Sequence, residues 1–207
     1  MSISASPRTG IECLRKPISF ILAFSWLAFA LVLMPQGFGQ GWYLAIELLG
    51  FLLLIVAALG RLWSYAFIGG RKNQELCTDG PYSLCRNPLY FFSLIGISGA
   101  GLALQSVMLF AVAVIGFLIY YHFVIRAEER RLLTLFGDAF TAYCREVPRF
   151  WPRIHKLAMP EIVSLPTKLF TRTLSEVFWF LAAIVIIEVI ENGKLAQWWP
   201  TVSTPLW

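Results

Sequence analysis

Five long apolar runs, separated by polar stretches, organise this chain. They cover residues 18–34, about 42–62, 89–104, 107–125 and 174–190. Runs of this length with few formal charges are typical of helices that cross a bilayer. We therefore predict an all-α, polytopic membrane protein with about five transmembrane helices. Gln105 and Ser106 leave room only for a tight turn, so the third and fourth helices are predicted to form an antiparallel hairpin.

The first and last apolar runs each admit an alternative. A basic start followed by an apolar run also describes a signal peptide, with Gly37-Phe38-Gly39 as a weak cleavage site. The run is long for a signal peptide, and we favour an uncleaved helix. The last run has Glu176 and Glu188 near its ends, and we favour a crossing helix over a re-entrant segment.

Between and after these runs the polar segments divide the chain into three parts. Residues 1–60 supply two N-terminal helices, 61–156 a methyltransferase-like region that carries the motifs, and 157–207 a C-terminal membrane segment and tail. Apolar residues recur at helical spacing after Arg126, which predicts an amphipathic helix on the membrane surface that Gly137 interrupts. Trp198, Trp199 and Trp207 are predicted to lie at the membrane interface.

Composition supports a membrane location. Hydrophobic residues make up 58% of the chain, charged residues 14%, and the mean hydropathy is +0.69. A soluble domain has about 25% charged residues. The net charge of +5 comes from basic residues that, in the predicted topology, all lie on one side except Lys194. This asymmetry predicts that the basic side faces the cytoplasm and anionic headgroups, and it explains the positive charge without a nucleic-acid partner. We expect a multi-pass protein of a bacterial inner membrane.

The cysteines do not indicate a metal site. The four cysteines include no C-x-x-C pair, and no histidine follows them at zinc-ligand spacing. All four are predicted on the cytoplasmic side, where thiols stay reduced. We expect free structural thiols, no disulfide and no bound metal.

Two polar stretches are predicted to meet at one depth. The first, QELCTDGPYSLCRNPLY, spans residues 74–90 and leads into the third helix. The second, RAEERRLLTLFG, spans residues 126–137 and follows the fourth helix. A hairpin returns its far end to the side where it began, so Arg86, Asn87 and Tyr90 should meet Glu128 and Glu129.

These residues resemble the membrane methyltransferase family that includes isoprenylcysteine carboxyl methyltransferase and phosphatidylethanolamine N-methyltransferase. The family pattern runs Gly-Xaa-Tyr, Arg-His-Pro-Xaa-Tyr, an apolar hairpin, Glu-Glu, Phe-Gly and Val-Pro-Arg-Phe. The matches, in order and over about half the chain, are Gly80-Pro81-Tyr82, Arg86 to Tyr90, Glu128-Glu129, Phe136-Gly137 and Val147-Pro148-Arg149-Phe150. One departure is Asn87, which stands where many members carry histidine.

The resemblance implies S-adenosylmethionine as the cofactor and a site for it. The implied cofactor contacts are Gln74, Glu75, Leu76, Cys77, Tyr82, Asn87, Pro88, Leu89, Tyr90, Gly99, Gly101 and Glu128. The implied catalytic residues are Arg86, Asn87, Arg126, Glu128 and Glu129. For Gly99 and Gly101 tight helix packing is at least an equal alternative.

The residue types suit that cofactor. Glu128 or Glu129 matches its ammonium group, Arg86 or Arg126 its carboxylate, and Asn87 both donates and accepts hydrogen bonds. A salt-bridged helix end at a membrane surface would use the same charges, but would not explain five motifs in order.

The acceptor is expected to be lipid-like or prenylated and to arrive from the bilayer, with carboxylate O-methylation favoured. Phospholipid N-methylation is the first alternative. An NADPH-dependent sterol-reductase-like enzyme and a non-catalytic membrane protein are the others. His122 is a candidate base for an amine acceptor, although packing against another helix is the simpler role for it.

Overall fold

The structure is a computed structural model that describes residues 10–35, 41–71, 74–161, 163 and 167–204. Predictions that concern Arg8, the loop at 36–40 or Trp207 lie outside the described residues. The elements are α1 (Gly10–Val32), β1 (Leu33–Pro35), α2 (Gly41–Ile68), α3 (Pro81–Leu84), α4 (Pro88–Ala103), α5 (Val107–Glu146), the 3-10 turn η1 (Ile154–Lys156), α6 (Thr167–Leu195) and β2 (Val202–Thr204).

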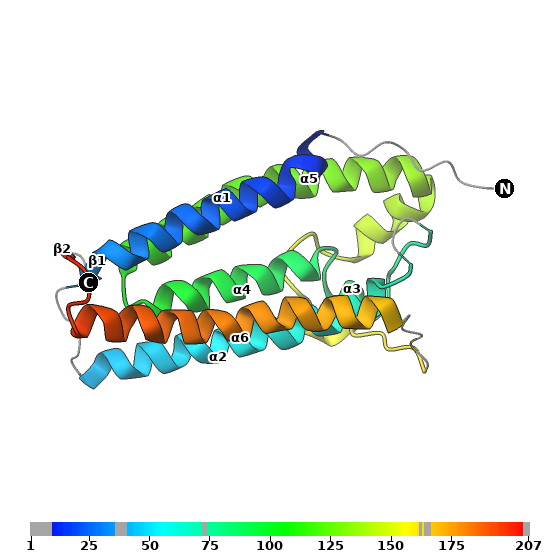
Figure 1. The fold of residues 1–207 in the computed structure, drawn as a ribbon. Coiled ribbons are helices and arrows are strands. Elements are labelled where there is room, and N and C mark those ends of the chain that lie inside the picture. The colour runs from blue at the N-terminus through cyan, green and yellow to red at the C-terminus, as the bar shows by residue number, and fades with distance from the viewer. Residues whose placement is uncertain (1–9, 36–40, 72–73, 162, 164–166, 205–207) are drawn as a thin grey trace.

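The five long helices lie lengthwise beside one another (Figure 1). Helix α2 packs on α4 and α6, α4 also packs on α5, and α1 lies along α5. Each predicted apolar run is helical over most of its length, with only the end of the first run lying in β1, and this confirms the all-α class. Two segments, Leu44–Ile68 and Val107–Glu146, are long and apolar enough to cross a membrane, judged by length and composition alone. Pro17–Val32 and Pro88–Ala103 are shorter apolar helices.

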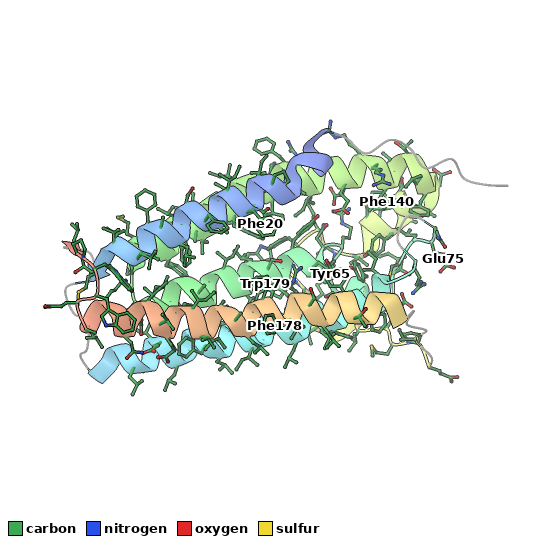
Figure 2. The ribbon with its side chains drawn as sticks, in the orientation of Figure 1. Phe20, Tyr65, Glu75, Phe140, Phe178 and Trp179 are labelled. Atoms are coloured by element: carbon green, nitrogen blue, oxygen red, sulfur yellow. The ribbon has the colours of Figure 1, made fainter. Side chains whose placement is uncertain are left out.

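The outer faces of the bundle carry many exposed apolar side chains. Phe20, Phe178 and Trp179 are each more than 60% exposed (Figure 2). Aliphatic side chains on α2 and α5, such as Leu52 and Val112, are also exposed. A soluble monomer rarely exposes contiguous apolar patches beyond a few hundred Å². This surface is the kind that a bilayer covers.

The segment after Arg126 differs from the prediction. Instead of forming a separate helix on the membrane surface, it continues α5 without a break as far as Gly137. Residues 126–136 contain no glycine or proline and are rich in Arg, Glu and Leu, all good helix formers, so nothing ends the helix there. At Gly137, with φ of 50°, the chain leaves the helical conformation and turns back toward the bundle (Figure 1).

Helix α6 contains the last apolar run, which the sequence allowed to be either a crossing helix or a re-entrant segment. It is continuous over 29 residues and runs the length of the bundle (Figure 1). A re-entrant segment would turn back partway along the bundle, and α6 does not, so the re-entrant alternative does not fit this helix. Beyond α6 the chain pairs β2 with β1 in parallel, and the Trp199 indole donates to the carbonyl of Leu31 at 2.7 Å. The sequence did not predict this closure.

Candidate cofactor site

A sharp turn before α3 sets the position of Tyr82. Gly80 has φ of 56°, and a Cβ on it would lie 2.3 Å from the Phe67 ring, so this position requires glycine. The Gly80 amide donates to the carbonyl of Ala158 at 2.7 Å. In return, the Ala158 amide donates to the Ser83 hydroxyl at 3.0 Å. The segment that follows the Val-Pro-Arg-Phe motif therefore holds the Gly-Pro-Tyr turn in place.

The Arg86 guanidinium lies beside one of the two predicted acids. It pairs with Glu129 at 3.3 Å and contacts the Cys144 sulfur. Glu129 also pairs with Arg149 at 2.9 Å. The segment before α4, helix α5 and the chain after α5 are thus joined through one carboxylate, and the expected meeting of Arg86 with the Glu-Glu pair is confirmed in geometry.

The chain around Asn87 is held by hydrogen bonds to the Val-Pro-Arg-Phe segment that follows α5. The Arg86 amide donates to the carbonyl of Pro148 at 2.9 Å, and the Asn87 side chain donates to the carbonyl of Arg149 at 2.9 Å. Asn87 is the N-cap of α4 and is 9% exposed, but its side chain makes no cap hydrogen bond. The amide instead positions the Val-Pro-Arg-Phe segment, and a titrating side chain is not needed for that contact.

The other acid faces the tyrosines. The Tyr90 hydroxyl donates to Glu128 at 2.8 Å, and the Tyr90 ring lies 4.9 Å from the ring of Tyr121. The Tyr82 hydroxyl is buried and has no hydrogen-bond partner in the described part of the chain, although Glu128 is near enough to act on it electrostatically. The Tyr143 hydroxyl donates to the carbonyl of Tyr82 at 2.7 Å and fixes its backbone.

An orphaned buried hydroxyl is costly, at about 1–3 kcal/mol. Among the described residues, buried Nε atoms of Arg86 and Arg149 also lack partners. A polar ligand between these groups would satisfy them. Together with Glu128 they form a donor and acceptor set that fits the amino-acid end of S-adenosylmethionine: a carboxylate for its ammonium group, and N–H and O–H donors for its carboxylate.

The loop before α3 is held by an ion-pair cluster. Arg71 pairs with Asp79 at 2.9 Å and with Glu75 at 3.0 Å. Burial acts to raise the pKa of Asp79, but hydrogen bonds from Arg71 and Cys77 outweigh it and lower that pKa below its ordinary value. Burial, reinforced by Asp79, raises the pKa of the Cys77 thiol to about 12.

The predicted contacts in this loop differ in position. Cys77 is buried beside Tyr82, and Leu76 packs with Phe140, Tyr143 and Val147. Gln74 and Glu75 are exposed, with Glu75 at the same end of the bundle as Phe140 (Figure 2). Only the inner half of the loop therefore adjoins the tyrosines.

Three predicted residues lie apart from this constellation. Arg126 is exposed on α5. A Cβ on Gly99 would lie 2.6 Å from the carbonyl oxygen of Gly50, and one on Gly101 would lie 2.8 Å from Phe110. Gly99 is 12 residues along α4 from Asn87, about 18 Å at 1.5 Å per residue. Helix packing accounts for both glycines, so we leave them out of the site.

Sequence reasoning missed three participants. Arg149 belongs to the Val-Pro-Arg-Phe motif, but its ion pair with Glu129 was not predicted. Arg149 is the one charged residue of that motif, and this was the signal that could have indicated an acidic partner. Cys144 and Tyr143 gave no signal, because their partners lie about 60 residues away. Beside the site is an open hollow of about 120 Å³, lined by Phe117, Leu118, Tyr121, His122, Ile125, Arg149 and Phe150.

Comparison with known proteins identifies the family. The phospholipid methyltransferase family model matches residues 44–139. The nickel-cobalt-cadmium resistance protein NccN of Alcaligenes xylosoxydans xylosoxydans is 36% identical over 157 residues, which are 76% of this chain and 73% of that protein. The cobalt-zinc-cadmium resistance protein CzcN of Cupriavidus metallidurans is 40% identical over 140 residues, which are 68% of this chain and 64% of that protein.

No solved structure matches the chain. The family match includes the Arg-Asn-Pro segment, the hairpin and both acids of the candidate site. Together with the similarity to NccN over most of both chains, it shows that this chain belongs to the phospholipid methyltransferase family.

Proposed function

We propose that this protein is an integral membrane methyltransferase that uses S-adenosylmethionine to methylate a lipid-like or prenylated acceptor, with a carboxylate as the favoured group. The observation that carries the proposal is that Glu128 contacts Tyr90 and Glu129 contacts Arg86, beside Asn87 and the Tyr82 hydroxyl, which has no partner in the described structure. When bound, the cofactor supplies an electrophilic methyl group on a sulfonium, so no covalent enzyme intermediate is needed.

Each residue has a distinct part in this proposal. Glu128 binds the ammonium group, held in orientation by the Tyr90 hydroxyl. Arg86 and Arg149 are held by Glu129 and direct N–H groups toward the carboxylate, while Tyr82 donates from its buried position. Asn87 keeps the segment bearing Arg149 against the site. Because the leaving group is already good, the protein accelerates the transfer mainly by aligning acceptor, methyl group and sulfur.

The hollow beside the site is the proposed position of the acceptor. Its wall is aromatic and aliphatic, and Arg149 and His122 bring polar groups to it. Tyr121 lines it and contacts Tyr90, which links it to the cofactor residues. A carboxylate acceptor needs no base. An amine acceptor must lose a proton first, and His122 is the residue of the hollow suited to accept it.

The proposed membrane arrangement has five crossings by α1, α2, α4, α5 and α6, in the inner membrane of a bacterium. The site end carries almost all the basic residues, so it is placed in the cytoplasm. A reporter fused after Trp207 should be active only in its extracytoplasmic form. Activity of a cytoplasmic reporter there would contradict five crossings.

The names of the two relatives suggest a setting for this activity. Both are named for resistance to cobalt, cadmium and a third metal. We propose that the methylated product serves cells exposed to such metals. Deleting the gene should then increase cobalt or cadmium sensitivity, and the Glu128→Gln variant should fail to restore resistance. Full rescue by that variant would show that resistance does not depend on methyl transfer by this protein.

Methyl transfer itself is the decisive test of function. Purified protein in detergent, incubated with S-adenosylmethionine labelled on its methyl group and a total membrane lipid extract, should yield a labelled apolar product. An alkali-labile label indicates a carboxyl ester, and an alkali-stable label indicates an amine. No label transfer, combined with saturable NADPH binding, would favour the reductase alternative. If neither label transfer nor NADPH binding is observed, a non-catalytic scaffold is favoured.

A further inference from the structure

A second cluster of polar side chains lies at the end of the bundle opposite the cofactor site. It contains Glu47 from α2, Gln105 from the turn between α4 and α5, and Glu191 and Lys194 from α6. The Gln105 side chain donates to Glu47 at 3.2 Å. None of these residues takes part in the proposed methyl transfer. They lie near the end where β1 pairs with β2.

Three of the four side chains in the cluster are buried, Glu47 is half-buried, and two of the cluster's oxygens have no partner among the described residues. Gln105 is 7% exposed, Glu191 6% and Lys194 2%. The Gln105 and Glu191 Oε1 atoms are buried without a hydrogen bond in the described structure. The amide nitrogen of Gln105 donates to Glu47, so the amide oxygen that lacks a partner is held next to the Glu47 carboxylate. Buried polar atoms of this kind call for a ligand or an explanation.

The two carboxyl groups of the cluster are in contact, so either a shared proton or a cation lies between them. Glu47 and Glu191 contact each other through their side chains, and Glu188 adds a third negative charge nearby. Carboxylates in contact cannot both stay ionised without a shared proton or a cation. Lys194 is the basic group of the cluster, and its Nζ donates to the carbonyl of Leu33 at 2.7 Å. With all three acids ionised, the charge of Lys194 would offset one of them, and a shared proton or a further cation would have to offset another.

The backbone supports an arranged site. Gln105 has φ of 54°, which is unusual for a residue with a side chain, and Ser106 caps α5 immediately after it. The turn therefore holds the Gln105 side chain against Glu47 of α2 at some cost in backbone energy. Carboxylate and amide oxygens are the ligands preferred by hard divalent cations, which often keep several waters when only one or two carboxylates are present.

We propose that Glu47, Glu191 and the amide oxygen of Gln105 form a binding site for one divalent cation at this end of the bundle. The sequence predicted no metal because the two acids lie in separate apolar helices far apart in the chain. The cation would join α2, the α4–α5 turn and α6. The site is independent of the proposed methyl transfer, so either proposal stands if the other fails.

The test is a titration of the full-length protein in detergent with Mn²⁺, following free Mn²⁺ by electron paramagnetic resonance. Wild-type protein should bind one Mn²⁺ saturably. Glu191→Gln and Glu47→Gln should each weaken binding at least about tenfold, because carboxylate charge sets the affinity of such sites. Glu146→Gln removes an exposed acid at the last residue of α5, the end of that helix away from Gln105, and should leave binding unchanged.

A variant that gains affinity shows that weaker binding by the other variants does not come from misfolding. Gln105→Glu keeps the side-chain length and the backbone demand while adding a third carboxylate, so it should tighten Mn²⁺ binding several-fold. Absence of saturable binding to wild type would overturn the proposal. Equal binding by wild type, Glu191→Gln and Gln105→Glu would also overturn it, because the bound ion would then lie elsewhere.

Discussion

The unpartnered hydroxyl of Tyr82 gives a prediction in which stability and binding move in opposite directions. Tyr82 is 5% exposed, and its hydroxyl finds no partner in the described structure. Burial, assisted by nearby Cys77, Glu128 and Tyr143, raises the pKa of Tyr82 well above its ordinary value, so the phenol stays neutral and remains a donor. Tyr82→Phe removes this oxygen and leaves the ring.

The magnitude follows from the cost of the buried oxygen. Leaving a buried hydroxyl unsatisfied costs about 1–3 kcal/mol, so Tyr82→Phe should stabilise the cofactor-free protein by up to that amount. For a chain of this size 1 kcal/mol corresponds to about 2–4 °C in Tm. Loss of one hydrogen bond to the cofactor, about 0.5–1.5 kcal/mol, should weaken S-adenosylmethionine binding roughly two- to tenfold.

The assay compares thermal unfolding and cofactor affinity in the same detergent. Tyr143→Phe is the matched control, because its hydroxyl has a partner in the carbonyl of Tyr82. That variant should lose about 0.5–1.5 kcal/mol of stability. If Tyr82→Phe lowers Tm and leaves cofactor affinity unchanged, the hydroxyl has a structural partner and does not face the cofactor.

Three further predictions concern the site and the packing around it. Glu128→Gln should weaken S-adenosylmethionine binding by about 1.5–3 kcal/mol, or roughly 10- to 150-fold, with little change in Tm; unchanged affinity in equilibrium dialysis would remove Glu128 from the site. Burial raises the pKa of both Cys77 and Cys85 to about 12, so iodoacetamide at pH 8.5 should label neither until the protein unfolds, and rapid labelling would contradict their burial. Because the unfolded thiols have a pKa near 8.5, the folded state binds these protons more tightly, and stability should fall as pH rises from about 8.5 toward 12. Gly99→Val should clash with Gly50 and lower Tm, with a loss of folding free energy of about 1–3 kcal/mol. Gly116→Ala, where a Cβ meets open space, should leave Tm unchanged, and equal effects of the two variants would show that α2 and α4 are not packed this closely.

The helices were predictable because apolar run length is a local property. The runs at 107–125 and 89–104 correspond to α5 and α4, and Ser106 caps α5 as a turn residue should. The error after Arg126 arose from treating the change to charged residues as the end of a helix. Arg, Glu and Leu sustain a helix as well as apolar residues do, and only Gly137 breaks it.

Part of the site was predictable for a geometric reason. A hairpin returns Glu129 to the level of Arg86, and the ion pair between them follows. The contacts of Arg149 and Asn87 depend on how the chain folds back after Gly137, which no local pattern reveals. The contact between Gln105 and Glu47 depends on which helices neighbour each other, and that too is set by packing over the whole bundle.

Equilibrium binding of labelled S-adenosylmethionine to the purified protein tests whether the residues gathered around Arg86 and Glu128 hold this cofactor. We predict saturable binding that S-adenosylhomocysteine competes and NADPH does not. Binding should fall at least about tenfold in Glu128→Gln while the variant retains its wild-type Tm, because a charge-assisted hydrogen bond is lost at a helix surface and not in a core. Binding of NADPH in place of S-adenosylmethionine, or S-adenosylmethionine binding that Glu128→Gln leaves intact, would contradict the proposed site.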